Sequence, residues 1–146
     1  MMPIPTVSII MPAYNASATL AASVKSAQAQ SLAIWELIII DDGSTDDTAR
    51  VALWLARSDP RICVLQRPNC GPSTARNTGA SVARADILAF LDADDFWAPE
   101  RLSGMVKAFH LLPTAGVLFS RTRFIHADTL KPGTLTAHRP ILGPTD

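Results

Sequence analysis

The run Leu37-Ile38-Ile39-Ile40, followed directly by Asp41-Asp42-Gly43-Ser44, indicates the fold class of this 146-residue chain. Four consecutive apolar residues, three of them β-branched, are typical of a strand that is covered on both faces. The two carboxylates and the glycine that follow predict a polar turn at the carboxyl end of that strand. Ligands of open parallel sheets bind beyond this end of the strands. The segment therefore predicts both a parallel sheet and the edge of the sheet where a site would lie.

Other apolar runs of strand length alternate with segments of helical period along the chain. We expect strands near residues 6–11, 36–40, 61–66, 86–91 and 115–120. Helices are expected after the first four strands, with Ser17, then Thr45 or Asp46, then Pro72 and Pro99 at their starts. This alternation predicts an α/β fold, a mostly parallel Rossmann-like sheet with helices on both faces. The predicted domain covers residues 1–127, and residues 128–146 form a tail that contains proline and glycine.

The composition excludes several classes of protein. The 13 Lys and Arg residues balance the 13 Asp and Glu residues, which gives no basic footprint for nucleic acid and no polybasic face for an anionic membrane. No apolar run approaches the ~20 residues of a membrane span, and no secretory signal is readable. Cys63 and Cys70 have neither metal-ligand nor redox spacing. We expect a cytoplasmic chain, and peripheral association with the inner face of the membrane stays open.

The acidic residues are concentrated in two short stretches that follow predicted strands. Seven of the 13 are Asp41, Asp42, Asp46, Asp47, Asp92, Asp94 and Asp95. Carboxylates this close repel one another unless a cation, a helix N-terminus or a hydrogen-bonded ligand compensates. Asp92 and Asp94, on the same side of an extended segment, can hold a divalent cation whose remaining oxygens come from a diphosphate. The alternative is an acidic turn that caps the helix after Pro99.

Two further groups of residues can complete a nucleotide site. The Asp42 carboxylate can accept from the N3–H of uracil or from a ribose hydroxyl, and the alternative is a turn that caps the next helix. Tyr14 can stack on a base, and Asn15 can tie its loop together; the alternative for Tyr14 is an ordinary loop aromatic. Arg76 can neutralise the carboxylates at this edge of the sheet or bind a diphosphate. A structural ion pair explains this arginine as well.

These motifs together resemble those of the family 2 glycosyltransferases, an inverting group with the GT-A fold. The resemblance covers about residues 6–125. The matching segments are Val7–Asn15, Glu36–Asp46, Gly71–Gly79, Phe90–Asp95 and Pro99–Leu102. It implies a nucleotide-sugar donor, with UDP as the expected nucleotide, Mn²⁺ or Mg²⁺ as the cofactor, and a saccharide or lipid-linked acceptor hydroxyl.

The resemblance also implies roles for individual residues. Asp94 resembles the metal ligand of the family's Asp-x-Asp motif. Asp95 resembles a residue that supports this ligand without binding the metal itself. The implied nucleotide-sugar-binding residues are Pro12, Ala13, Tyr14, Asn15, Asp41, Asp42, Arg76, Asp92 and Ala93. Asp42 would read the base, Asp41 would support it, and Asp92 would lie near the ribose.

The resemblance ends before the acceptor half in which family members normally carry their general base. After Asp95 the acidic residues are Glu100, Asp128 and Asp146, and none of them can be assigned as the base. We therefore expect either the donor-binding part of a glycosyltransferase or a non-catalytic nucleotide-sugar-binding module. A response regulator would need an acidic pair after the first strand, and a dinucleotide-binding oxidoreductase would need Gly-x-Gly-x-x-Gly there. Neither pattern is present.

Overall fold

The computed structural model describes residues 4–120, 123–125 and 132–135 of the chain. The chain forms two compact units, Met1–Leu111 and Leu112–Asp146. The first contains a four-stranded sheet with its helices, and the second contains a two-stranded sheet. The predicted domain boundary at residue 127 stays a prediction. None of the described helices is long and apolar enough to cross a membrane.

The main sheet is fully parallel and has the strand order β3-β2-β1-β4. Its strands are β1 (Val7–Ala13), β2 (Trp35–Asp41), β3 (Ile62–Gln66) and β4 (Ile87–Phe90). Ile10 lies opposite Ile38 on one side and opposite Phe90 on the other. The four strands agree with the predicted ranges to within two residues. All four carboxyl ends therefore lie at one edge of the sheet.

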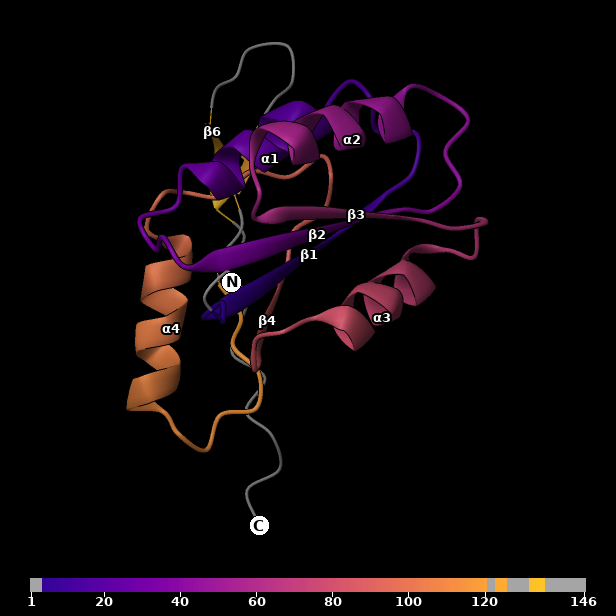
Figure 1. Ribbon diagram of the computed structural model, residues 1–146. Helices are drawn as coiled ribbons and strands as arrows, with labels where there is room; N and C mark the ends of the chain where they lie inside the picture. The colour runs from indigo at the N-terminus through magenta and orange to yellow at the C-terminus, as the bar shows by residue number, and fades with distance from the viewer. Residues whose placement is uncertain (1–3, 121–122, 126–131, 136–146) are drawn as a thin grey trace. The chain divides into compact units, whose positions relative to one another are not determined.

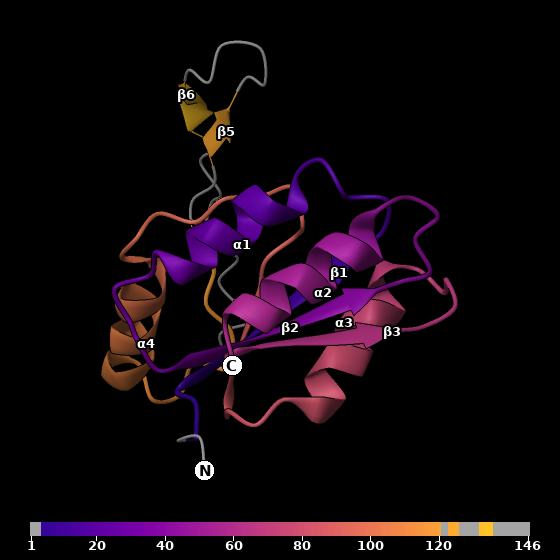
Figure 2. The same cartoon turned by 45° about the horizontal axis from the view of Figure 1, so that its top comes forward.

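Helices cover both faces of this sheet, as the apolar runs predict. The helices α1 (Leu20–Gln28) and α2 (Thr48–Ser58) pack on one face, and α3 (Pro72–Val82) packs on the other (Figure 1). Every residue of β2 is buried between them. Alternate strand residues such as Ile39 and Ile40 belong to the two separate apolar cores. The helix α4 (Arg101–Leu111) lies near the C-terminal end of α1 (Figure 2). Its Leu102 and Val106 belong to the same apolar core as α1 and α2.

The helix starts agree only partly with the predicted caps. Pro72 is the first residue of α3, as predicted. Ser17 is not the cap of α1, because that helix begins after Thr19 and its cap makes no side-chain hydrogen bond. The Ser17 N–H donates instead to the Asp46 carboxylate. Asp46 also accepts from the N–H of Thr48, so it satisfies the first donor of α2 although Asp47 is the residue at the cap position.

The prediction of a fifth strand near residues 115–120 is wrong. The chain there has no regular structure, and Val117 and Phe119 are 66% and 86% exposed, so no neighbouring element buries their apolar side chains. The strands of the second unit are β5 (Arg123–Ile125) and β6 (Pro132–Leu135), which pair antiparallel. The strand β6 lies within the predicted tail. Pro132 is its first residue, a position at which a strand tolerates proline.

The helix α3 approaches the sheet closely at Gly79. A Cβ atom on this residue would lie 2.6 Å from Cγ2 of Ile10 and 2.7 Å from Cδ1 of Ile40. Both isoleucines are fully buried strand residues, so they have little room to give way. The absence of a side chain at Gly79 therefore sets the distance between α3 and the sheet.

We predict that Gly79→Ala lowers the free energy of unfolding by about 1–3 kcal/mol, because overpacking outweighs the better helix propensity of alanine. The matched control is Gly104→Ala on α4, where an added Cβ meets no atom within 4 Å. This control should raise the stability by up to about 1 kcal/mol. Urea denaturation measures both variants. Equal stabilisation by the two substitutions would contradict the close approach of α3.

Candidate functional site

A cleft of about 790 Å³ lies at the carboxyl edge of the main sheet. Segments that follow all four strands line it, and its volume is in the range of small-molecule sites. The lining residues are Pro12, Ala13, Tyr14, Asn15, Ala16, Thr19, Asp42, Asn69, Gly71, Pro72, Arg76, Asp92, Ala93 and Asp94. The structure thus brings nine of the ten residues singled out from the sequence to one cleft. Asp41 is the exception.

The loop after β1 is joined to the loop after β2 through Asn15. The Asn15 Oδ1 atom accepts from the N–H of Thr45 at 2.8 Å, and the Asn15 N–H donates to Oγ of Ser44 at 3.0 Å. Asn15 has a φ of 49°, a left-handed conformation that asparagine tolerates better than most residues. The expectation that Asn15 ties this loop together is confirmed. Tyr14, its neighbour, is half exposed at the cleft.

Asp46 adds further hydrogen bonds between the segments that follow β1 and β2. Its carboxylate accepts from the N–H of Ser17 at 3.1 Å and from the N–H of Thr48 at 2.9 Å. Hydrogen bonds from Thr48 and Ser17 hold the pKa of Asp46 well below its ordinary value. In addition, the N–H of Ala16 donates to Oγ1 of Thr48 at 2.7 Å. Asp46 therefore stabilises the loops, and it does not line the cleft.

Asp41 and Asp42 have different environments although both are buried. The Asp41 carboxylate accepts from the N–H of Ser44 at 3.2 Å and closes the turn around Gly43, which has a φ of 73°. Asp42 lines the cleft, and its carboxylate accepts from the N–H groups of Cys70 and Gly71 at the start of α3. The structure thus places Asp41 in the turn that carries Asp42.

The Asp42 carboxylate has little acceptor capacity left for a ligand. Its oxygens bond to the N–H of Gly71 at 2.8 Å and of Cys70 at 3.2 Å, and Nε of Arg67 lies 3.2 Å from Oδ1. The Cys70 N–H lies 3.2 Å from both oxygens, so three donors share the about four lone-pair sites of the carboxylate. Asp42 can therefore accept at most one further N–H or O–H group from a molecule in the cleft.

Asp92 and Asp94 line the same cleft but do not lie on an extended segment. The N–H of Asp95 donates to the carbonyl of Asp92 at 3.1 Å, which closes a turn over Asp92–Asp95. This corrects the expected extended geometry, because a hydrogen bond between residues three apart requires the backbone to turn. The Asp92 carboxylate is 2.6 Å from Nη2 of Arg76 on α3. The structural ion pair considered for Arg76 is therefore present, and the arginine also lines the cleft.

The negative charge of this turn is only partly balanced. Partial desolvation, together with the carboxylates of Asp94 and Asp92, raises the pKa of Asp95 above its ordinary value, and Arg101 offsets part of the effect. Within the described ranges, no three His, Cys, Asp or Glu side chains come together as a metal site. A cation bound at Asp94 would therefore take further oxygens from a ligand or from water.

Sequence reasoning overlooked the contribution of the loop after β3. Asn69 lines the cleft, and Arg67 contacts Asp42. Both follow the strand Ile62–Gln66 at its carboxyl end, the same positional signal that identified the other three loops. Ala16 and Thr19, which also line the cleft, carry no comparable signal because small residues at the start of a helix are common.

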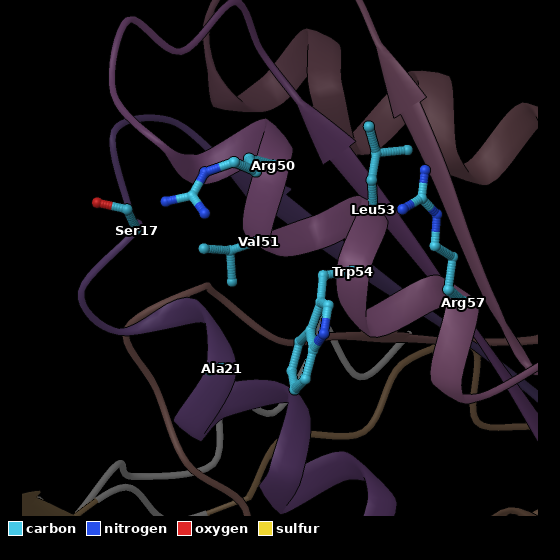
Figure 3. A pocket seen from close by; sticks show the side chains of 7 residues that line it. All are labelled: Ser17, Ala21, Arg50, Val51, Leu53, Trp54 and Arg57. Atoms are coloured by element: carbon cyan, nitrogen blue, oxygen red, sulfur yellow. The ribbon is translucent and has the colours of Figure 1, made fainter.

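A second hollow, of about 540 Å³, lies between α1 and α2 (Figure 3). It is lined by Ser17, Ala21, Arg50, Val51, Leu53, Trp54 and Arg57. No carboxylate, histidine or cysteine lines it, and the Arg50 guanidinium pairs with Asp47 at 2.8 Å. The arrangement that can bind a polar ligand and a cation is thus the cleft at the strand ends.

Comparison with known proteins gives one family and several structural relatives. The model of glycosyl transferase family 2 matches residues 8–144. The Escherichia coli UDP-Glc:alpha-D-GlcNAc-diphosphoundecaprenol beta-1,3-glucosyltransferase WfaP is 38% identical over 119 residues, which are 81% of this chain and 45% of that protein. The Staphylococcus aureus TarS structure in complex with UDP-GlcNAc has a TM-score of 0.67 and 27% identity, over 72% of this chain and 31% of that chain.

The mannosyltransferase PcManGT from Pyrobaculum calidifontis, solved with GDP-Man and Mn²⁺, has a TM-score of 0.68 and 26% identity. The match covers 72% of this chain and 32% of that chain. This chain therefore spans less than half the length of each of these relatives.

We predict that Asn15→Ala increases the hydrogen-exchange rate of the Thr45 amide by about 5- to 30-fold, which corresponds to roughly 1–2 kcal/mol of lost hydrogen bonding. Asn15→Asp keeps the accepting Oδ1 atom and should leave the exchange rate near that of the wild type. Exchange measured by NMR reports both variants. Unchanged protection of Thr45 in Asn15→Ala would show that Asn15 does not hold the two loops together.

Proposed function

Because the chain belongs to glycosyl transferase family 2, we propose that it binds a UDP-sugar in the cleft at the carboxyl edge of its sheet and is the donor-binding part of a metal-assisted, inverting glycosyltransferase. One observation carries this proposal. A single cleft combines an aromatic ring, a buried carboxylate, an arginine and two further carboxylates, contributed by Tyr14, Asp42, Arg76, Asp92 and Asp94. These groups suit the base, the diphosphate and the cation of one ligand.

The proposed nucleotide is UDP because of the acceptor at Asp42. Uracil presents a single N3–H donor on its pairing edge, which suits a buried carboxylate that can accept at most one further hydrogen bond. Adenine presents a ring acceptor at the corresponding position, which Asp42 would repel. The half-exposed ring of Tyr14 supplies a stacking surface beside it. WfaP is named for UDP-Glc, and TarS was solved with UDP-GlcNAc, which supports the same choice.

The residues at the Asp92–Asp95 turn fit a divalent cation with few protein ligands. Hard cations such as Mg²⁺ and Mn²⁺ are commonly held by one or two carboxylates together with the phosphates of the substrate. Asp94 would bind the cation, while Arg76 keeps the Asp92 carboxylate in place beside it. A bound cation would neutralise charge that develops on the departing diphosphate. The Mn²⁺ complex of PcManGT supports this assignment.

The proposed acceptor is a saccharide or lipid-linked hydroxyl group, consistent with the diphosphoundecaprenol acceptor in the name of WfaP. Attack from the face opposite the diphosphate would invert the sugar carbon, and a general base must take the proton of the hydroxyl. Glu100 does not line the cleft, and Asp128 and Asp146 lie outside the described residues. The base is therefore unassigned. We propose that the protein acts in the cytoplasm at the inner face of the membrane.

A second candidate function is a module that binds a nucleotide sugar without transferring it. The residues that the structure describes around the cleft support it, because their carboxylates are Asp42, Asp92 and Asp94, all of which have binding roles in the proposal. Under this alternative, UDP-sugar binding would be intact, but a whole protein that contains these residues would transfer no sugar.

We predict that wild-type protein binds UDP more tightly than ADP, and that Asp42→Ala lowers the UDP affinity by about 10- to 150-fold, the effect of losing a charge-assisted hydrogen bond. Calorimetry with both nucleotides measures this. Asp42 also holds the start of α3, so a loop disordered by the substitution would weaken the binding of both nucleotides alike. The decisive quantity is therefore the ratio of the two affinities, which should collapse in the variant. An unchanged ratio would refute base reading by Asp42.

A further inference from the structure

A row of polar side chains on α1 and directly after it faces the protein interior. Ser23, Ser26 and Gln30 are spaced by three and four residues, so they lie on one side of the helix and its C-terminal extension. Ser23 is fully buried, and Gln30 is 7% exposed. Buried polar groups are costly unless they are hydrogen-bonded. The hydrogen-bond partners of these three side chains therefore indicate their structural role.

All three side chains bond to the backbone of the segment between β4 and α4. Oγ of Ser23 donates to the carbonyl of Ala93 at 2.8 Å, and Oγ of Ser26 accepts from the N–H of Trp97 at 3.2 Å. The Gln30 amide donates to the carbonyl of Ala98 at 2.8 Å and accepts from the N–H of Leu102 at 2.9 Å. Residues 91–98 have no strand or helix of their own, so α1 satisfies backbone groups that regular structure would otherwise pair.

The contact at Ala93 lies within the acidic turn. The carbonyl of Ala93 belongs to the peptide unit that joins this residue to Asp94, and a peptide unit is planar. Its bond to Ser23 therefore fixes the orientation of the backbone from which the Asp94 side chain projects. Ala93 is 5% exposed and belongs to the same apolar core as α1, so the peptide has little freedom to turn away.

We propose that Ser23 is a positioning residue that orients the Asp94 carboxylate for the cation and the donor diphosphate, an inference that rests on the proposed function. The turn is then held from both faces of the sheet. Ser23 on α1 fixes the backbone at Ala93, and Arg76 on α3 fixes the Asp92 carboxylate at 2.6 Å. Groups that orient metal ligands typically change metal affinity about 10- to 100-fold when they are removed.

Ser8 provides a matched control for the loss of a buried serine hydroxyl. Like Ser23, it is completely buried. Its Oγ donates to Glu36 at 2.6 Å and accepts from the N–H of Ala85 at 3.0 Å. Ser8 lies near the amino end of β1 and does not line the cleft. Ser8→Ala therefore reports the general cost of removing a buried hydroxyl.

The test is calorimetric titration of UDP with and without Mn²⁺, using the full chain of the wild type, Ser23→Ala and Ser8→Ala. The quantity compared is the factor by which Mn²⁺ increases the UDP affinity. We expect Ser23→Ala to lower this factor by about tenfold, with a smaller change in metal-free UDP binding. Ser8→Ala should keep the wild-type factor even if it unfolds more easily. Ser23→Cys, with a similar volume and a weaker donor, should lie between Ser23→Ala and the wild type.

The possible failures are distinguishable. If Mn²⁺ does not increase the UDP affinity of the wild type, both the proposed function and the role of Ser23 are wrong. If the wild type responds to Mn²⁺ and Ser23→Ala responds equally, only the role of Ser23 is overturned. A loss of the same size in Ser8→Ala would also overturn it, because the effect would then follow general stability.

Discussion

The parallel pairing of β1 with β2 on one side and with β4 on the other places the loops after these three strands at one edge of the sheet. Ala13 lies opposite Asp41, and Leu91 donates its N–H to the carbonyl of Ile10. Tyr14 and Asp42 therefore follow the ends of the neighbouring strands β1 and β2, and Asp92 follows the end of β4 on the other side of β1. Any shift of register would separate these residues, and the apolar side chains that fill both cores oppose such a shift.

The loops themselves contain little regular structure, and side-chain contacts to neighbouring backbone hold them in place. Asn15 joins the loops after β1 and β2, and Asp42 binds the start of α3. Ser23 binds the turn after β4 at Ala93. Each loop is thus fixed by a residue from another element, so the position of a cleft residue depends on partners distant in the sequence. This arrangement explains why a cleft built from short irregular segments can have a defined shape.

Much of this architecture follows from the sequence because apolar periodicity and strand-end chemistry are local signals. The GT-A type of fold implied by the motifs is confirmed by the parallel sheet and by the structural relatives. What the sequence hides depends on tertiary contacts. Ser23 and Gln30 look like ordinary polar residues of an exposed helix, and only the packed chain shows them buried against another segment. The apolar run around Val117 has the composition of a strand, yet the structure gives it no covering element.

Paramagnetic line broadening by Mn²⁺ in the NMR spectrum of the labelled chain, recorded with and without UDP, tests whether the cleft binds a donor diphosphate through a cation at Asp94. With UDP present, the amide signals of Ala93, Asp94 and Asp95 should broaden strongly, while those of Leu53 and Trp54 beside the second hollow should stay sharp. Without UDP the broadening should be weak, because the diphosphate completes the oxygen shell of the cation. Broadening that is centred elsewhere, or that is equally strong without UDP, would contradict this assignment of the site.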